Sequence, residues 1–251
     1  MHAYASVSTA DDVKVGDIDI ESGERLYPGI GHGENQLRWG FIRKVYGILA
    51  AQILVTTAVT AATVLYVPIN DLLRENSGFL LFLVFNRHLI CMTVLWPLHI
   101  YRQKHPLNLV FLGLFTASMS LTVGVSCANT EGRLVLEALI LTSAVVSALT
   151  GYTFWAAKKG KDFSFLGPIL FTSLFILILT GFIQMVYPLG STSVAVYSAI
   201  SAIIFSGYIV YDTENLIKRF TYDEYIWASV TLYLDVLNLF LTILRMLKQD
   251  N

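Results

Sequence analysis

Two aspartates stand inside strongly apolar stretches near the C-terminal end of the sequence, Asp212 in YIVYDTENLI and Asp235 in LYLDVLNLFL. A charge within a hydrocarbon-embedded helix is costly and usually functional, so this pair is the first candidate site. The midpoint between the two residues falls at Asp223 and Glu224, in a polar turn. An antiparallel hairpin folded there places both carboxylates at similar depth, on the order of 12–15 Å along each helix at a rise of about 1.5 Å per residue.

The chemistry of such a pair follows from the proximity of its carboxyl groups. Two adjacent carboxylates in a poorly hydrated site do not both ionise easily, so we expect Asp212 and Asp235 to share a proton and to respond to pH. Their oxygens are also hard ligands, which suit Ca²⁺ better than a soft metal. The pair therefore predicts a pH sensor and a weak cation site, with calcium as a permeant or weakly bound ion and no resident cofactor. The structural alternative is a pair that only clamps two helices.

The composition indicates that lipid is the solvent for most of the chain. Of its 251 residues, 55% are hydrophobic and 14% are charged, whereas a soluble domain carries about 25% charged residues. The formal net charge of −1 gives no electrostatic basis for binding nucleic acid. The expected partner on this ground is membrane lipid, and protons and calcium are expected partners of the acid pair.

The chain divides into two regions by composition. Residues 1–36 are acidic and poor in large apolar side chains, so we interpret them as a disordered cytosolic tail. Residues 37–251 are interpreted as a membrane domain, because seven apolar stretches each approach the roughly 20 residues that span a bilayer. Such stretches satisfy their backbone hydrogen bonds in lipid as helices, which predicts an all-α integral membrane protein with a seven-helix bundle. The predicted spans are Phe41–Val67, Phe79–Tyr101, Leu107–Ala128, Leu134–Ala157, Phe163–Tyr187, Thr192–Thr213 and Ile226–Leu247.

The distribution of Lys and Arg predicts the orientation. Eleven of them fall between Arg25 and the start of the first span and in the even-numbered connections, and four fall on the opposite side. By the positive-inside rule, the N-terminus is cytosolic and the C-terminus lumenal or extracellular.

Polar residues mark the second and seventh spans. NRH at 86–88 interrupts the second span: either Arg87 reaches an interface and the helix starts later, which we favour, or it faces a polar interior. The seventh span carries Tyr233, Asp235 and Asn238, which suits a central helix surrounded by the others.

Six stretches of the membrane domain are distinctive as a set. They are FIRKVYGILAAQ at 41–52, RQKHPLNLVFLGLFT at 102–116, LEALILTSAV at 136–145, FSFLG at 163–167, YIVYDTENLI and LYLDVLNLFLTILR. Together they resemble the transmembrane Bax inhibitor motif family, and within it a plant-type member of the Lifeguard branch. The resemblance covers about Leu37 to Leu247. The chain departs from many animal relatives after YDT, where it has the short KRFTYDEY instead of a longer His- and Gly-containing connection.

The resemblance implies a seven-helix bundle with the last helix central. It also implies calcium leak from intracellular stores and suppression of stress-induced cell death, in the endoplasmic reticulum or another endomembrane such as the Golgi or vacuole. Asp212 and Asp235 match the paired aspartates that act as the family's pH-sensitive gate. Partners among cell-death regulators or other membrane proteins are expected on the same ground.

Two further site residues come from the resemblance. Arg102 matches an arginine at the end of the second helix that pairs with the first aspartate as a latch, although a slip of one residue puts Tyr101 in its place. Ordinary positive-inside usage explains an arginine there equally well. Glu137 matches another acidic position of the family, with either a pathway role or a solvated interfacial one.

The remaining polar residues near the pair have simpler interpretations. We interpret Glu214, Asp223 and Glu224 as solvated turn residues. Tyr211 and Tyr233 are each close in sequence to an aspartate, and either donate a hydrogen bond to it or pack in the core.

Three functions compete. The first is a calcium leak channel under pH control, which is not an enzyme. The second is an intramembrane aspartyl protease, which also places YD and a second aspartate on successive helices; here LYL precedes Asp235 instead of Gly-x-Gly, and no Pro-Ala-Leu motif follows. The third is a non-conducting interaction protein that modulates cell-death or calcium-channel partners. Calcium flux into liposomes containing the pure protein separates the three.

Overall fold

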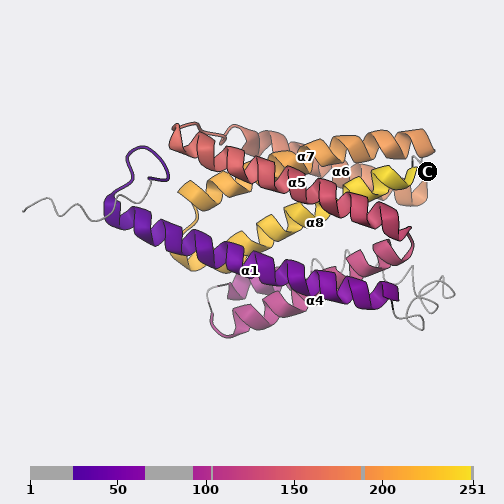
Figure 1. Cartoon of the computed structure of the whole chain (residues 1–251), viewed down its shortest axis with the longest axis horizontal. Coiled ribbons are helices and arrows are strands. Elements are labelled where there is room, and N and C mark those ends of the chain that lie inside the picture. Colours follow the sequence, from indigo (N-terminus) through magenta and orange to yellow (C-terminus); the bar gives the residue numbers. More distant parts are fainter. Residues whose placement is uncertain (1–24, 66–92, 103, 188–189, 250–251) are drawn as a thin grey trace, which may run out of the picture.

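The computed structural model describes residues 25–65, 93–102, 104–187 and 190–249. Within these ranges the chain is helical apart from short turns and contains no strand, which confirms the all-α prediction. The helices form an elongated bundle (Figure 1). They are α1 (His32–Leu65), α4 (Leu107–Ala128), α5 (Gly132–Lys158), α6 (Leu166–Val186), α7 (Ser191–Lys218), the 3₁₀ turn η1 (Tyr222–Glu224) and α8 (Tyr225–Gln249).

Among the described residues, six helices are long and apolar enough to cross a membrane. They correspond to the first and the third to seventh predicted spans, and Leu107–Ala128 has the predicted bounds. The second predicted span, Phe79–Tyr101, lies largely outside the described residues. Only its last part, 93–101, is described, and it is helical. The count of seven spans therefore stays a prediction.

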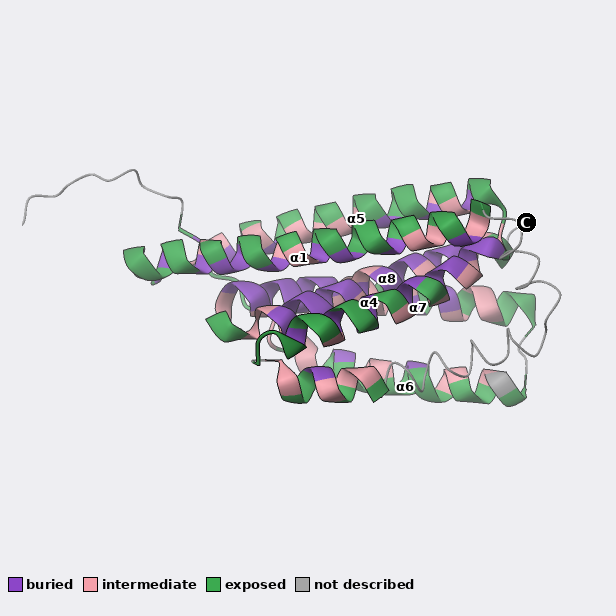
Figure 2. Cartoon of the chain, turned by 90° about the horizontal axis from the view of Figure 1, so that it is seen from below, coloured by how far each residue is buried: buried purple, intermediate pink, exposed green. Residues whose placement is uncertain are grey.

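α8 and α6 occupy contrasting environments. α8 contacts α1, α4, α5 and α7, and its apolar stretch is the most deeply buried of the six spans. Figure 2 shows buried residues along much of its length. α6 packs mainly on α7 and exposes large side chains such as Phe171 and Phe175. An apolar helix exposed in this way is suited to face lipid, since lipid tails are as apolar as the side chains themselves.

The first helix begins earlier than the predicted span Phe41–Val67, so its first turns fall within the region interpreted as a tail. α1 starts at His32, and Leu26 before it is fully buried. The Leu26 backbone N–H donates to Asn35 Oδ1 at 3.1 Å. Arg38 is buried on the first turns of α1, where its Nη1 donates to the Phe220 carbonyl at 2.6 Å. These contacts anchor the chain from Leu26 onward, whereas the prediction for residues 1–24 lies outside the described residues.

Candidate functional site

An antiparallel hairpin positions the two aspartates. α7 ends at Lys218, α8 begins at Tyr225, and η1 lies between them. Thr221 and Glu224 form a capping box in which the Glu224 carboxylate accepts the Thr221 backbone N–H at 3.0 Å. Such a box satisfies backbone donors that the start of a helix leaves free. The predicted turn at Asp223 and Glu224 is confirmed, and α7 packs extensively on α8.

The hairpin brings the two carboxyl groups together in the interior. Asp212 retains 9% of its surface and Asp235 retains 6%, so both are closed off from bulk solvent. Their side chains lie close enough to interact directly. A hydrogen bond between two carboxyl groups requires a proton on one of them, because a carboxylate can only accept. The structure therefore places the two acids side by side, and the shared proton stays a prediction.

Two neighbours complete the site, and the sequence interpretation missed both. Asn215, one turn beyond Asp212 on α7, donates from Nδ2 to Asp212 Oδ1 at 3.4 Å, while its own Oδ1 is buried without a partner in the described part of the chain. Thr231, one turn before Asp235 on α8, places its hydroxyl near Asp212, while the hydroxyl proton goes to the Ala228 carbonyl at 3.2 Å. Spacings of three and four residues from each aspartate were the available signal, because such residues share a helix face.

The oxygens of this site can contact a cation but do not form a closed cage. Asp235 Oδ2 and Asn215 Oδ1 are both buried and have no hydrogen-bond partner among the described residues. Within the described ranges, no group of three or more His, Cys, Asp or Glu side chains is placed to hold a metal ion. Because Ca²⁺ takes six to eight oxygens, two carboxyl groups and one amide suit transient contact with a passing ion better than tight binding.

Arg102 lies elsewhere than the latch interpretation predicts. Its Nη2 is 3.4 Å from Glu224 Oε1, with both side chains partly exposed. In the part of the chain that the structure describes, Arg102 forms no ion pair with Asp212. The physical reason is depth: Asp212 lies six residues before the end of α7 at Lys218, about 9 Å along the helix at roughly 1.5 Å per residue. Arg102 and Glu224 instead tie residues 93–102 to the start of α8.

Glu137 occupies an exposed helix end. It accepts from Arg133 Nε at 2.9 Å, one turn earlier on α5, and the two side chains are 40% and 85% exposed. The contact is an ordinary (i, i+4) surface pair, which contributes about 0.3–0.5 kcal/mol. The position therefore favours the solvated interfacial role over a pathway role.

Glu214 is buried, so its interpretation as a solvated turn residue is wrong. It is 1% exposed, and its two carboxylate oxygens accept the Phe163 backbone N–H at 3.1 and 2.9 Å. Lys218 Nζ lies 2.8 Å from the same carboxylate and also donates to the Lys161 carbonyl. Glu214 therefore fastens the connection between α5 and α6 to the end of α7. The (i, i+4) spacing of Glu214 and Lys218 was the signal that sequence analysis could have used.

Neither neighbouring tyrosine donates to an aspartate. The hydroxyl of Tyr211 lies against Gly167 at the start of α6, where an added Cβ would come within 2.9 Å of it. The hydroxyl of Tyr233 bonds to Thr56 on α1 at 2.7 Å. Packing and hydrogen bonds to other helices therefore account for both.

Fold and site together define a class: an all-helical protein with membrane-spanning helices and an acid pair buried between its last two helices. The sequence family described as inhibitor of apoptosis-promoting Bax1 matches residues 38–251. The chain belongs to this Bax inhibitor family.

Several relatives are similar over nearly their whole length. A "BI1-like protein" of Arabidopsis thaliana is 67% identical over 255 residues, which cover 100% of this chain and 98% of that protein. "Protein LIFEGUARD 4" of Arabidopsis thaliana is 52% identical over 240 residues, 95% of each chain. A "Golgi anti-apoptotic protein" of Vaccinia virus (strain Lister) is 39% identical over 215 residues, 86% of this chain and 87% of that protein.

Proposed function

We propose that this protein is a pH-sensitive calcium leak channel of an intracellular membrane, and that it suppresses stress-induced cell death by regulating calcium stores. The observation that carries the channel proposal is the pair of Asp212 and Asp235, which lie side by side inside the bundle. Hydrophobic side chains would hold α7 and α8 together without desolvating two acids, so a purely structural pair is the less economical explanation. The relatives named anti-apoptotic support the second part of the proposal.

The mechanism rests on the number of protons that the pair holds. With one shared proton, the pair carries a single charge and holds α7 and α8 together. Loss of that proton leaves two charges that repel, which favours separation of the helices or occupancy by a cation. A second proton removes the charge that attracts a cation. The direction of the pH effect on flux depends on which of these steps limits permeation.

Arg102 forms an ion pair with Glu224, and this pair takes the place of the Arg102–Asp212 latch that the resemblance implied. It joins residues 93–102 to the beginning of α8, at the turn between the two aspartate-bearing helices. We propose that this contact restrains the cytosolic mouth, while the acid pair acts deeper in the bundle. Because both side chains are partly exposed, its contribution to stability is small, about 0–1 kcal/mol.

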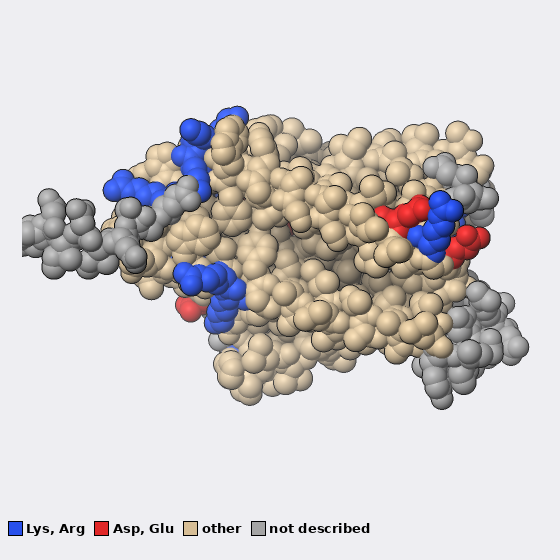
Figure 3. Space-filling view, in the orientation of Figure 1, with Lys and Arg blue, Asp and Glu red and all other residues tan. Residues whose placement is uncertain are grey.

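We further propose the full topology of seven spans, with Phe79–Tyr101 as the second and α8 as the central helix. The N-terminus is cytosolic and the C-terminus lumenal, in the endoplasmic reticulum or another endomembrane. The start of α1 and the end of α8 lie at opposite ends of the bundle (Figure 1), as an odd number of spans requires. On the face shown in Figure 3, Lys and Arg gather at the end where α1 begins, and the opposite end carries acidic and basic side chains together. The viral relative named for the Golgi is compatible with an endomembrane.

Reconstitution of the pure protein into liposomes loaded with a calcium dye tests the channel proposal. We expect calcium flux above that of protein-free liposomes, and the Asp212→Asn and Asp235→Asn proteins serve as matched controls. Absence of flux from correctly folded protein would favour a non-conducting interaction protein. Cleavage of a co-reconstituted membrane peptide would instead support a protease. Tags after Met1 and Asn251 test the topology, and both tags on one side would contradict it.

A further inference from the structure

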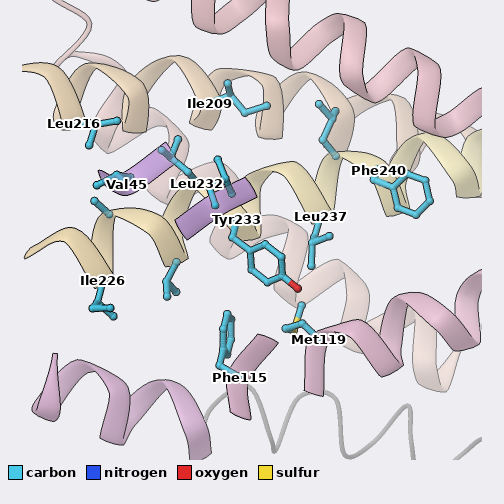
Figure 4. Packing of buried hydrophobic residues seen from close by; sticks show 14 of the residues in the cluster. Val45, Phe115, Met119, Ile209, Leu216, Ile226, Leu232, Tyr233, Leu237 and Phe240 are labelled. Atoms are coloured by element: carbon cyan, nitrogen blue, oxygen red, sulfur yellow. The ribbon is translucent and has the colours of Figure 1, made fainter. Parts of the chain in front are cut away.

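A second group of polar side chains lies inside the membrane domain, on the other side of α8 from the acid pair. Tyr233 is fully buried on α8, and its hydroxyl points toward the α4 segment that carries Phe115 and Met119 (Figure 4). Tyr233 is two residues from Asp235, about 200° around an α-helix, so the two face nearly opposite directions. The group comes from three helices, and each member is at most 5% exposed: Gln52, Thr56, Thr116, Ser120 and Tyr233.

The hydroxyl protons of this cluster are already committed. Thr56 donates to the Gln52 carbonyl at 2.8 Å, and Thr116 donates to the Leu112 carbonyl at 2.8 Å. Ser120 donates to the Thr116 carbonyl at 2.6 Å, and the same hydroxyl lies 3.1 Å from the Thr56 hydroxyl oxygen. Since Thr56 has no further proton, the 2.7 Å contact between Thr56 and Tyr233 is a bond that Tyr233 donates. The hydroxyl oxygens therefore face one another mainly with lone pairs. The cluster has more hydrogen-bond acceptors than donors.

The same accounting fixes the orientation of the Gln52 amide. The Thr116 hydroxyl oxygen can only accept, and Gln52 Nε2 lies 3.1 Å from it, which places the nitrogen of the amide on that side. Gln52 Oε1 is then left buried and, among the residues that the structure describes, without a hydrogen-bond partner. A buried amide oxygen of this kind is normally satisfied by protein or by ordered water.

We infer that this cluster is a water-binding site between α1, α4 and α8, separate from the acid pair. A bound water supplies the donors that the cluster lacks: it gives one hydrogen to Gln52 Oε1 and a second to another oxygen lone pair. These two contacts supply the minimum of the two to four polar partners that a buried water requires. A hard monovalent cation would also be attracted to these oxygens, but no carboxylate in the cluster compensates its charge. This site does not depend on the proposed calcium function.

Hydroxyl-radical footprinting of the full-length protein in lipid nanodiscs, read by mass spectrometry, tests the inference. Radiolysis of a bound water oxidises side chains beside it even when bulk solvent does not reach them. We expect oxidation of Tyr233 and Met119 in the wild type at rates severalfold above that of Phe240, which is similarly buried in the apolar core. Gln52→Leu should abolish the excess at Tyr233 and Met119 and leave Phe240 unchanged. Equal rates for all three residues in the wild type would overturn the inference.

Control variants separate the site from general effects of substitution. Gln184→Leu on α6 makes the same chemical change in another membrane helix and should leave the oxidation of Tyr233 unaltered. If Gln52→Leu does not fold, Gln52→Met keeps the side-chain length without the amide and takes its place. Replacing Na⁺ and K⁺ with choline should not change the pattern. Loss of the pattern in choline would assign the site to a cation and overturn the inference of water.

Discussion

α8 has two polar faces, and the buried polar groups on each face are satisfied in a different way. Toward α7, Asp235 meets Asp212, and a hydrogen bond between them requires a shared proton. Toward α1 and α4, Tyr233 meets hydroxyl groups whose protons are bound by backbone carbonyls of their own helices. We expect the first arrangement to change with pH and the second to stay the same, because hydroxyl groups do not ionise in the physiological range. On this proposal, a single helix combines a contact that protons can switch with one that they cannot.

Glu214 is a third buried acid, and its substitution should cause the largest loss of stability. Glu214 is satisfied by donors that do not need a shared proton, namely the Phe163 N–H and Lys218. Glu214→Ala should lower the free energy of unfolding by about 2–4 kcal/mol, because breaking a buried ion pair costs about 3–5 kcal/mol and Lys218 is partly exposed. Thermal unfolding in detergent and hydrogen exchange at the Phe163 amide measure it. Glu137→Ala is the control and should cost about 0–1 kcal/mol.

The second-largest loss of stability is expected when the pair of Asp212 and Asp235 is broken. Asp235→Leu removes the proposed hydrogen-bond partner of buried Asp212, and should lower the free energy of unfolding by about 1–3 kcal/mol. Asp235→Asn should cost less, since the amide can still donate to Asp212. Chemical denaturation near neutral pH makes the comparison. If both variants were as stable as the wild type, the carboxyl groups would not be bonded in the folded protein.

Substitution on the uncharged face of α8 should lower the free energy of unfolding by a smaller amount. It should not change the pH dependence of calcium flux. Tyr233→Phe removes one hydrogen bond while keeping the ring against Phe115, at a cost of about 0.5–1.5 kcal/mol. Tyr197→Phe is the matched control, because that hydroxyl donates to the Leu177 carbonyl on α6. Neither change should alter the pH profile of calcium flux. A shifted profile in Tyr233→Phe alone would show that the two faces of α8 are coupled.

The smallest effect is expected from an acid outside the membrane. Hydrogen bonds from the Ser164 hydroxyl and backbone N–H lower the pKa of Asp162, and the charges of Lys218 and Arg219 act in the same direction. Its stabilising contribution is therefore present above the usual aspartate value of about 3.9 and is lost only as the pH falls through the lower folded value. Asp162→Asn should leave the flux profile between about pH 6 and 8 unchanged. A changed profile would place part of the pH response in this connection.

The helices could be predicted from the sequence because lipid imposes a strong length and composition requirement on each span. Their ends could not, since α1 begins at His32 through contacts of Leu26 and Arg38 that hydropathy does not report. The hairpin and its acid pair followed from the symmetric spacing of Asp212 and Asp235 about a polar turn. In each of these cases, the contacts lie within one helix or between two helices that follow each other in the sequence.

The failures involve contacts between distant segments. Glu214 resembled a solvated turn residue because Phe163, which it binds, is 51 residues away. Pairing of Arg102 with Asp212 was one of two interpretations, and the sequence does not report that Arg102 lies beside Glu224. Thr56 and Tyr233 are separated by 177 residues, so the uncharged cluster had no local signal. Such contacts depend on how the helices pack, and the periodicity of apolar residues in the sequence does not determine that packing.

The pH profile of calcium flux into liposomes tests most directly whether Asp212 and Asp235 act as one unit. Wild type, Asp212→Asn, Asp235→Asn and the double variant should be compared between about pH 6 and 8, where a coupled pair can titrate. We predict that each single substitution blunts the pH dependence and that the double variant adds little to the stronger single one, because residues in one hydrogen-bonded unit are not additive. An unchanged pH dependence in both single variants would contradict the account and leave the pair with a structural role.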